Sequence, residues 1–264
     1  MTMPANETFV VLAGAGPGDA GLITLKLQQR IAEADVIIAD RLVNPEIITT
    51  HAKPGVRVIL AGKQGYNDAS YTQEEINQLI VESAAAHKKV LRLKGGDIAF
   101  FSNVLDELQT LKEHSIPFEI IPGITAASGA SAYAGIPLTA RGYAQGVQFL
   151  TFNPNSVYTE EQWKWLASTS DTLVCYMASK NLQLLIDTLL NNGCPGSKPV
   201  AVVEQSTTPQ QKVYTSVLSR VKTDFSDKTF LSPSLVIIGD VVELHQQFGW
   251  FRGGEDGSVF QELR

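Results

Sequence analysis

The sequence is poor in the residues that would indicate a disulfide framework, a metal centre or a membrane span. Its two cysteines, Cys175 and Cys194, are too few for a disulfide framework and fit a reducing compartment such as the cytoplasm. The four histidines show no ligand spacing, so no metal site is predicted. No apolar run approaches the roughly 18 residues that span a bilayer. The first residues lack the pattern of a signal peptide, so we expect a cytoplasmic protein with no membrane partner.

Positive charge is also scarce. Lys and Arg number 21 against 27 Asp and Glu, which gives a formal net charge of −6. Nucleic-acid-binding domains are more often basic, so no nucleic-acid partner is predicted. Hydrophobic residues, in contrast, make up 44% of the 264 residues, which is enough to fill a core. At roughly 150 residues per domain, this length predicts about two domains.

Short apolar runs alternate with helix-like stretches along the first half of the chain. The runs are rich in Val, Ile and Leu, as expected of strands that are buried on both faces of a parallel sheet. One of the stretches between them opens with Thr72 and Glu75, the spacing of a capping box. Strands that alternate with helices predict an α/β fold. The predicted strands span 9–13, 36–39, 56–61, 90–93 and 118–121, and the predicted helices span 22–34, 72–86 and 105–114.

The composition changes after Pro122-Gly123. Residues 124–135 are rich in Ala, Ser and Gly, which suits a helix in close contact with a neighbouring element or a ligand. We therefore predict an N-terminal α/β domain at 1–122 and a C-terminal α/β domain at 123–264. In the second domain the predicted strands span 147–152, 172–177, 199–204 and 235–239, and the predicted helices span 160–167 and 180–191.

A glycine-rich segment, Gly14-Ala-Gly16-Pro17-Gly18-Asp19, lies between the first predicted strand and the first predicted helix. Its glycines allow a tight turn and the close approach of a ligand to the main chain. The dinucleotide-binding pattern G-x-G-x-x-G needs a glycine at position 19, and the carboxylate of Asp19 would repel a pyrophosphate. A ligand without phosphates is compatible with this segment, and so is a plain strand–helix turn with a capping Asp.

Polar residues also follow three other predicted strands at their carboxyl ends, where open α/β sheets bind ligands. Lys94-Gly95-Gly96-Asp97 follows the fourth strand, and Asp97 could accept hydrogen bonds from an amine or a ribose, or belong to a tight turn. Asp40-Arg41 follows the second strand, and Lys63 follows the third. Asp40 could act as a base and the two cations could receive anions, while a surface ion pair is the alternative.

In this order, the segments resemble the tetrapyrrole (corrin/porphyrin) methylases, and within that family the uroporphyrinogen-III C-methyltransferases. The resemblance runs from about residue 9 to Phe251. It implies two α/β domains with S-adenosyl-L-methionine in a cleft between them, in a homodimer. The segments that carry it are V-x-L-A-G-A-G-P-G-D at 10–19, A-D-V-I-I-A-D-R-L-V at 34–43, G-K at 62–63, Q-E-E-I-N-Q-L-I at 73–80, R-L-K-G-G-D at 92–97 and the stretch from I-P-F-E to I-P-L-T at 116–139.

The resemblance also implies the cofactor contacts. S-adenosyl-L-methionine carries a sulfonium cation and no phosphate, which agrees with the carboxylates of Asp19 and Asp97. Phe100 and Ser206 stand at two further contact positions where other residues are usual. The implied contacts are Pro17, Gly95, Gly96, Asp97, Thr125, Ala126 and Met177.

The implied reaction methylates carbons 2 and 7 of uroporphyrinogen III to give precorrin-2, and releases S-adenosyl-L-homocysteine. Asp40 would be the base of this reaction and Lys63 the acid. The substrate is a polycarboxylate, so an acidic protein must place cations locally to bind it. Arg141 and Arg41 would do so, with Lys63 and Arg92 as further candidates.

Several positions depart from the family pattern. Asn103 stands where the family has an arginine that meets a substrate carboxylate, and Asp106 where it has a glutamate. Gln64 and Ala140 also replace usual residues. Three interpretations therefore stay open: an active uroporphyrinogen-III methyltransferase, a methylase of the same fold for a different tetrapyrrole, and a cofactor-binding paralogue without turnover. A nicotinamide dehydrogenase is rejected, because position 19 is not glycine.

Overall fold

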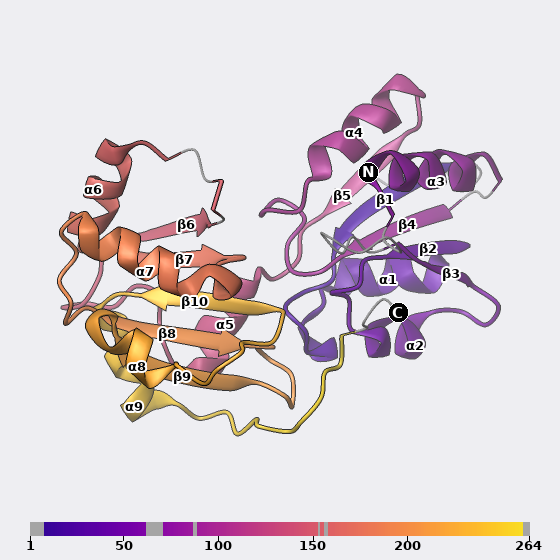
Figure 1. Ribbon diagram of the computed structural model, residues 1–264. Coiled ribbons are helices and arrows are strands. Elements are labelled where there is room, and N and C mark those ends of the chain that lie inside the picture. The colour runs from indigo at the N-terminus through magenta and orange to yellow at the C-terminus, as the bar shows by residue number, and fades with distance from the viewer. Residues whose placement is uncertain (1–7, 62–70, 87–88, 153, 156–157, 261–264) are drawn as a thin grey trace. The chain divides into compact units, whose positions relative to one another are not determined.

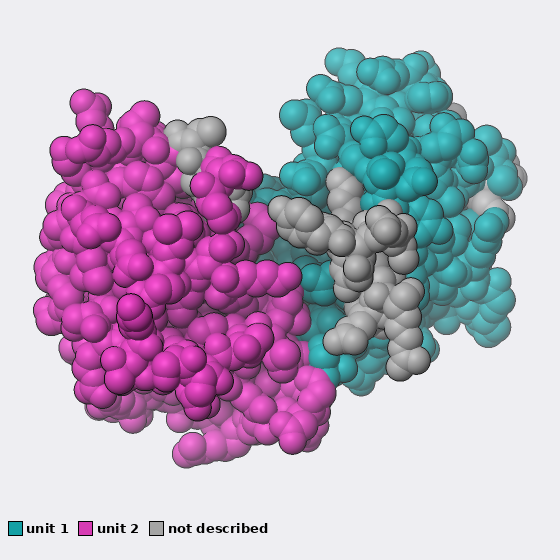
Figure 2. Space-filling view, in the orientation of Figure 1, with its two compact units in different colours: residues 1–126, 258–264 teal, residues 127–257 magenta. Residues whose placement is uncertain are grey.

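The computed structural model describes residues 8–61, 71–86, 89–152, 154–155 and 158–260. The chain divides into two compact units, unit 1 with residues 1–126 and 258–264, and unit 2 with residues 127–257 (Figure 2). The domain bounds expected from the sequence, 1–122 and 123–264, stay a prediction, because compactness does not show which segments fold independently.

Unit 1 is built on a parallel sheet whose strands lie in the order β3-β2-β4-β1-β5 (Figure 1). The central strands are buried on both faces, because β1 is buried along its whole length and β4 along nearly all of it. All five strands run in the same direction, so their carboxyl ends lie along one edge of the sheet. They are β1 (Phe9–Gly14), β2 (Val36–Ala39), β3 (Arg57–Leu60), β4 (Lys89–Lys94) and β5 (Phe118–Ile121).

Helices cover both faces of this sheet. Val11 and Ala13 of β1 pack with α1 and α2 on one face, while Val10 and Leu12 pack with α3 and α4 on the other. The Asn44 side chain caps α2 by accepting a hydrogen bond from the Glu46 amide. The helices are α1 (Leu25–Glu33), α2 (Pro45–His51), α3 (Gln73–Ala86) and α4 (Val104–Glu113), preceded by the 3-10 turn η1 (Ala20–Leu22).

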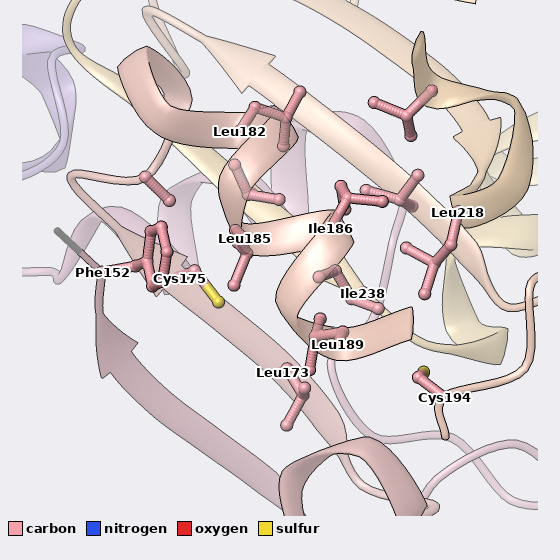
Figure 3. Packing of buried hydrophobic residues seen from close by; sticks show 14 of the residues in the cluster. Phe152, Leu173, Cys175, Leu182, Leu185, Ile186, Leu189, Cys194, Leu218 and Ile238 are labelled. Atoms are coloured by element: carbon pink, nitrogen blue, oxygen red, sulfur yellow. The ribbon is translucent and has the colours of Figure 1, made fainter. Parts of the chain in front are cut away.

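Unit 2 holds a mixed sheet in the order β6-β7-β10-β8-β9, in which β6 and β7 are parallel and the other neighbours antiparallel. Leu185 and Leu189 of α7 pack on one face of it, together with Leu173 and Cys175 of β7 (Figure 3). On the other face Ala127 and Ala130 of α5 pack against Val174. The strands are β6 (Val147–Thr151), β7 (Thr172–Tyr176), β8 (Pro199–Glu204), β9 (Lys212–Val217) and β10 (Ser234–Ile238).

The helices of this second part of the chain are mostly short. They are α5 (Ala126–Ala134), α6 (Glu160–Ser168), α7 (Leu182–Asn191), α8 (Val221–Asp224) and α9 (His245–Phe248), with the 3-10 turns η2 (Ser179–Asn181), η3 (Leu218–Arg220) and η4 (Asp240–Leu244).

The predicted α/β fold class is confirmed, and every predicted strand and helix is present within a few residues of its expected bounds. Besides the short helices α8 and α9 and the 3-10 turns, two elements were missed. One is α2, although Asn44-Pro45 carries the signal of a capping residue followed by proline at the first helical position. The other is β9, whose side chains are all partly exposed or exposed and so give no continuous apolar run.

Candidate functional site

Four glycines lie in close main-chain contact where β1, β4 and β5 end. The Gly16 amide donates to the Gly96 carbonyl at 3.0 Å, and the Gly96 amide donates back to Gly16 at 2.7 Å. A Cβ on Gly14 would lie 2.5 Å from the Gly96 carbonyl oxygen and 2.9 Å from the Gly123 nitrogen. Since Cβ atoms essentially never come within 3.0 Å of other atoms, these main chains fit together only as glycines.

The glycine-rich segment after β1 is also fixed to its neighbours. The Asn44 side chain donates to the Gly18 carbonyl at 2.9 Å, which ties the segment to the start of α2. Asp19 accepts a hydrogen bond from the Gly21 amide at 2.7 Å and so caps η1, the structural role that its sequence position allowed. Pro17 is buried beside it. Hydrogen bonds at both Gly18 and Asp19 thus fix the conformation of this turn.

Asp97 is buried at the end of the Gly-Gly-Asp segment. Its Oδ1 accepts from the Ala99 amide at 2.6 Å and its Oδ2 from the Gly123 amide at 3.1 Å. Gly95 lies against Leu42, where an added Cβ would come within 2.8 Å of the Leu42 carbonyl oxygen. Asp97 thus ties its own segment to the segment at Gly123, and its carboxylate retains lone pairs for a ligand amine or hydroxyl.

Asp40 and Arg41 open a tight turn directly after β2. The Asp40 side chain accepts from the Leu42 amide, and its carbonyl accepts from Val43. Both Asp40 and Arg41 are partly exposed. Lys63, the acid that the resemblance implies, lies outside the described residues, as does Gln64.

Arg92 and Lys94 of β4 and Glu107 of α4 form a buried charged cluster. The Glu107 Oε1 atom accepts from Arg92 Nε and from Lys94 Nζ, each at 3.1 Å. Arg92 is 2% exposed and Glu107 is fully buried, so the expectation that Arg92 could bind a substrate carboxylate is wrong. Burial lowers the pKa of Lys94, although the charge of Glu107 opposes this shift.

Little in the sequence indicated this cluster. Arg92 and Lys94 alternate along β4 and so share one face of the sheet, but their partner lies on α4, which packs on that face only in the folded chain. Asn103 directly precedes this helix, at the capping position, and has φ 55° and no side-chain capping bond. The residue that replaces the family's arginine therefore sits in the left-handed region, which Asn tolerates better than most residues.

The other predicted site residues divide between the two units. Thr125 and Ala126 lie at the start of α5, at the end of the first segment of unit 1. Met177 follows β7 in unit 2, where it is 62% exposed and has φ 57°. Arg141 is exposed in a turn closed by hydrogen bonds between Ala140 and Ala144. A positive φ is uncommon for a methionine, so the conformation of Met177 indicates a backbone that is held in place by the surrounding structure.

A buried polar loop joins β8 to β9 and was not predicted. Gln205 and Thr207 both have positive φ, and Gln211 accepts a hydrogen bond from the Thr207 amide at 2.8 Å. The side-chain Nε2 atom of Gln205 donates to the Gly257 carbonyl, while the Oε1 atom of the same side chain is buried without a hydrogen-bond partner among the described residues. Ser206, at one of the two atypical contact positions, is buried in this loop.

Carboxylates dominate the carboxyl edge of the sheet in unit 1. Asp40, Asp97 and Asp19 follow the neighbouring strands β2, β4 and β1, while Glu107 engages the buried cations Arg92 and Lys94. This charge fits a cationic ligand better than a pyrophosphate. Among the residues that the structure describes, no group of three or more His, Cys, Asp and Glu side chains could hold a metal ion. None of the described helices has the length and apolar character to cross a membrane.

Comparisons with known proteins match nearly the whole chain. A family model for the Tetrapyrrole (Corrin/Porphyrin) Methylases matches residues 10–222. "Siroheme synthase 2" of Aeromonas hydrophila subsp. hydrophila is 44% identical over 246 residues, which are 93% of this chain and 52% of that protein. The chain therefore spans about half the length of such relatives.

Solved structures extend this likeness to the fold. A uroporphyrin-III C-methyl transferase from Thermus thermophilus, complexed with S-adenyl homocysteine, is 32% identical with a TM-score of 0.74, and the match covers 89% of this chain and 94% of that one. A cobalt precorrin-4 methyltransferase has a TM-score of 0.80 at 24% identity over 92% of this chain and 99% of that one, which supports the fold alone.

Proposed function

The chain belongs to the tetrapyrrole (corrin/porphyrin) methylases, and we propose that it methylates uroporphyrinogen III at carbons 2 and 7 with S-adenosyl-L-methionine, to give precorrin-2. The observation that carries this proposal is the likeness to a uroporphyrin-III C-methyl transferase over 94% of that enzyme's length. The homodimer and the cytoplasmic location stay predictions.

The residues of unit 1 fit this methyl donor. The donor is a cation with an amino acid and a nucleoside but no phosphate, and the edge formed by Asp19, Asp40 and Asp97 is acidic. The fixed main chains around Gly95 and Gly96 allow an approach that side chains would block. The proposed cofactor contacts are Pro17, Gly95, Gly96, Asp97, Thr125, Ala126 and Met177.

The chain's part in the reaction is to position the reactants and to move a proton. When bound, S-adenosyl-L-methionine supplies an electrophilic methyl group. A pyrrole carbon of the substrate forms the new C–C bond as the C–S bond breaks, and a proton must then leave the macrocycle. Asp40 is the proposed base and Lys63 the proposed acid, while Arg41 and Arg141 bind substrate carboxylates. S-adenosyl-L-homocysteine is the second product.

An anaerobic turnover assay tests this function. The protein is supplied with freshly generated uroporphyrinogen III and S-adenosyl-L-methionine, and the masses of the oxidised products are measured by mass spectrometry. We expect two added methyl groups for the wild-type chain and a large loss of rate for Asp40→Asn. Asp227→Asn, an exposed aspartate of unit 2, is the matched control. No methyl addition, with cofactor binding verified by calorimetry, would contradict the proposal and favour another tetrapyrrole substrate or a paralogue without turnover.

A further inference from the structure

Tyr176 ends strand β7 at a fixed position in the sheet of unit 2. It is paired with Thr151 of β6 on one side and with Leu235 of β10 on the other. Its ring packs edge to face against Phe149, with the ring centroids 6.3 Å apart and the planes at 77°. Tyr176 and Val174 lie two residues apart on β7, so both point to the face of the sheet that α5 covers. The tyrosine side chain is therefore directed toward this helix.

The hydroxyl group of Tyr176 supplies a partner for the main chain at the start of α5. The amide groups in the first turn of an α-helix have no acceptor within the helix. The amide of Ala127, the second residue of α5, donates to the Tyr176 hydroxyl oxygen at 3.1 Å. Ala127 is fully buried, so water cannot replace this acceptor. The phenol thus ties the first turn of α5 to the end of β7, which lies 49 residues away in the sequence.

The composition of α5 makes this hydrogen bond important. Apart from Tyr133, the helix consists of Ala, Ser and Gly, and glycine has a low helix propensity. The small side chains let the helix lie close to the sheet, where Ala127 and Ala130 are fully buried. Such side chains offer few atoms that could interlock with the sheet, so a directional hydrogen bond at the first turn resists its displacement.

Tyr176 also leads directly into Met177, whose side chain is 62% exposed and whose φ is 57°. Met177 is one of the proposed cofactor contacts, and Ala126, the first residue of α5, is another. Tyr176 is joined to Met177 by the chain itself, and to the amide that follows Ala126 by the hydrogen bond. One side chain therefore links two segments that would hold the methyl donor.

We propose that Tyr176 is a positioning residue for the methyl donor, whose hydroxyl group holds the first turn of α5 at a fixed spacing from Met177. This inference rests on the proposed function, which assigns Ala126 and Met177 to S-adenosyl-L-methionine. Tyr176 touches neither the donor nor the substrate in this proposal, and it acts through the two segments that it joins. Loss of the hydroxyl group should weaken binding of the donor and leave methyl transfer from the bound donor unchanged.

The test compares Tyr176→Phe with the wild type in the full chain. The variant loses one oxygen atom and keeps the ring that packs against Phe149. In calorimetry its Kd for S-adenosyl-L-homocysteine should rise about three- to tenfold, as expected for one hydrogen bond. In the turnover assay the KM for S-adenosyl-L-methionine should rise while kcat stays unchanged. Tyr158→Phe is the matched control and should behave as the wild type, because Tyr158 is a half-buried tyrosine of the same unit with its own edge-to-face contact, to Trp163.

Hydrogen exchange followed by mass spectrometry measures the position of α5 without any ligand. In Tyr176→Phe the peptides from the start of α5 should exchange faster, while those of α7 should exchange as in the wild type and so show that unit 2 stays folded. Unchanged affinity, unchanged exchange at α5 or a loss of protection throughout unit 2 would each overturn the proposal. If donor binding weakens as expected but the wild type methylates no uroporphyrinogen III, the proposed function fails and the role of Tyr176 stands. A wild type that does not bind S-adenosyl-L-homocysteine would overturn both.

Discussion

Replacing Glu107 with glutamine should destabilise the chain far more than an ordinary change of charge. Glu107 is fully buried, and its Oε1 atom is the shared acceptor for Arg92 and Lys94. The glutamine keeps an acceptor oxygen but leaves two buried cations without a counter-charge. Because Glu107 also raises the pKa of Lys94, its loss should lower that pKa further.

The size of the effect follows from the burial. Removing one partner of a buried ion pair costs about 3 to 5 kcal/mol, and the retained hydrogen bond places Glu107→Gln at about 3 kcal/mol. For a chain of this length, 1 kcal/mol shifts the melting temperature by about 2 to 4 °C, so the expected fall is about 6 to 12 °C. Glu113→Gln, on an exposed position of the same helix, should change stability by less than about 0.5 kcal/mol.

Urea unfolding followed by circular dichroism would measure both variants against the wild-type chain. The midpoint of Glu107→Gln should fall with an unchanged slope, while Glu113→Gln should overlay the wild type. Equal stability of the two variants would refute the reasoning, since it would mean that the buried cations need no carboxylate. The triple variant with apolar side chains at 92, 94 and 107 should be more stable than Glu107→Gln, because no charge remains buried.

Three further predictions concern other parts of the fold. Gly14→Ala places a methyl group 2.5 Å from a main-chain oxygen, so it should cost about 2 kcal/mol or more and abolish binding of S-adenosyl-L-methionine in calorimetry. Burial raises the pKa of Glu204, so its folded pKa lies above the unfolded value and its contribution to stability is lost as the pH rises. The melting temperature of the wild type minus that of Glu204→Gln should therefore fall as the pH rises above 4.5. Burial raises the pKa of Cys175 to about 12 and also raises that of Cys194, so iodoacetamide at pH 8 should label neither thiol until urea is added, as read by mass spectrometry.

Local signals in the sequence were sufficient for most of the strands and helices. The buried strands are short runs of Val, Ile and Leu, and helices such as α6 carry their own caps, here Thr159 with Gln162. Strand β9 was not predicted, because a partly exposed edge strand lacks such an apolar run. Pro17 and Asp97 were expected to lie in turns after β1 and β4, and the structure has them there. Their contacts with the cofactor stay predictions.

The cluster of Arg92, Lys94 and Glu107 could not be predicted from local signals in the sequence. Its members belong to β4 and α4, and only the packing of this helix on the sheet brings Glu107 to Arg92 and Lys94. Sequence reasoning therefore made Arg92 a further candidate for substrate binding, whereas its burial places it in the protein interior. The structural role of Asp97 was likewise hidden, because its second bond goes to Gly123, 26 residues away.

The glycine contacts at the end of β1 have a consequence for genetics. At Gly14 the three atoms nearest to an added methyl group all belong to the main chain. No side-chain substitution elsewhere can remove a main-chain atom, so selection from a Gly14→Ala strain should return reversions at that codon. Gly146 is the opposite case, because the three atoms nearest to an added methyl group there all belong to the side chain of Asp171. A Gly146→Ala strain should therefore yield second-site suppressors at codon 171, with smaller residues in place of the aspartate.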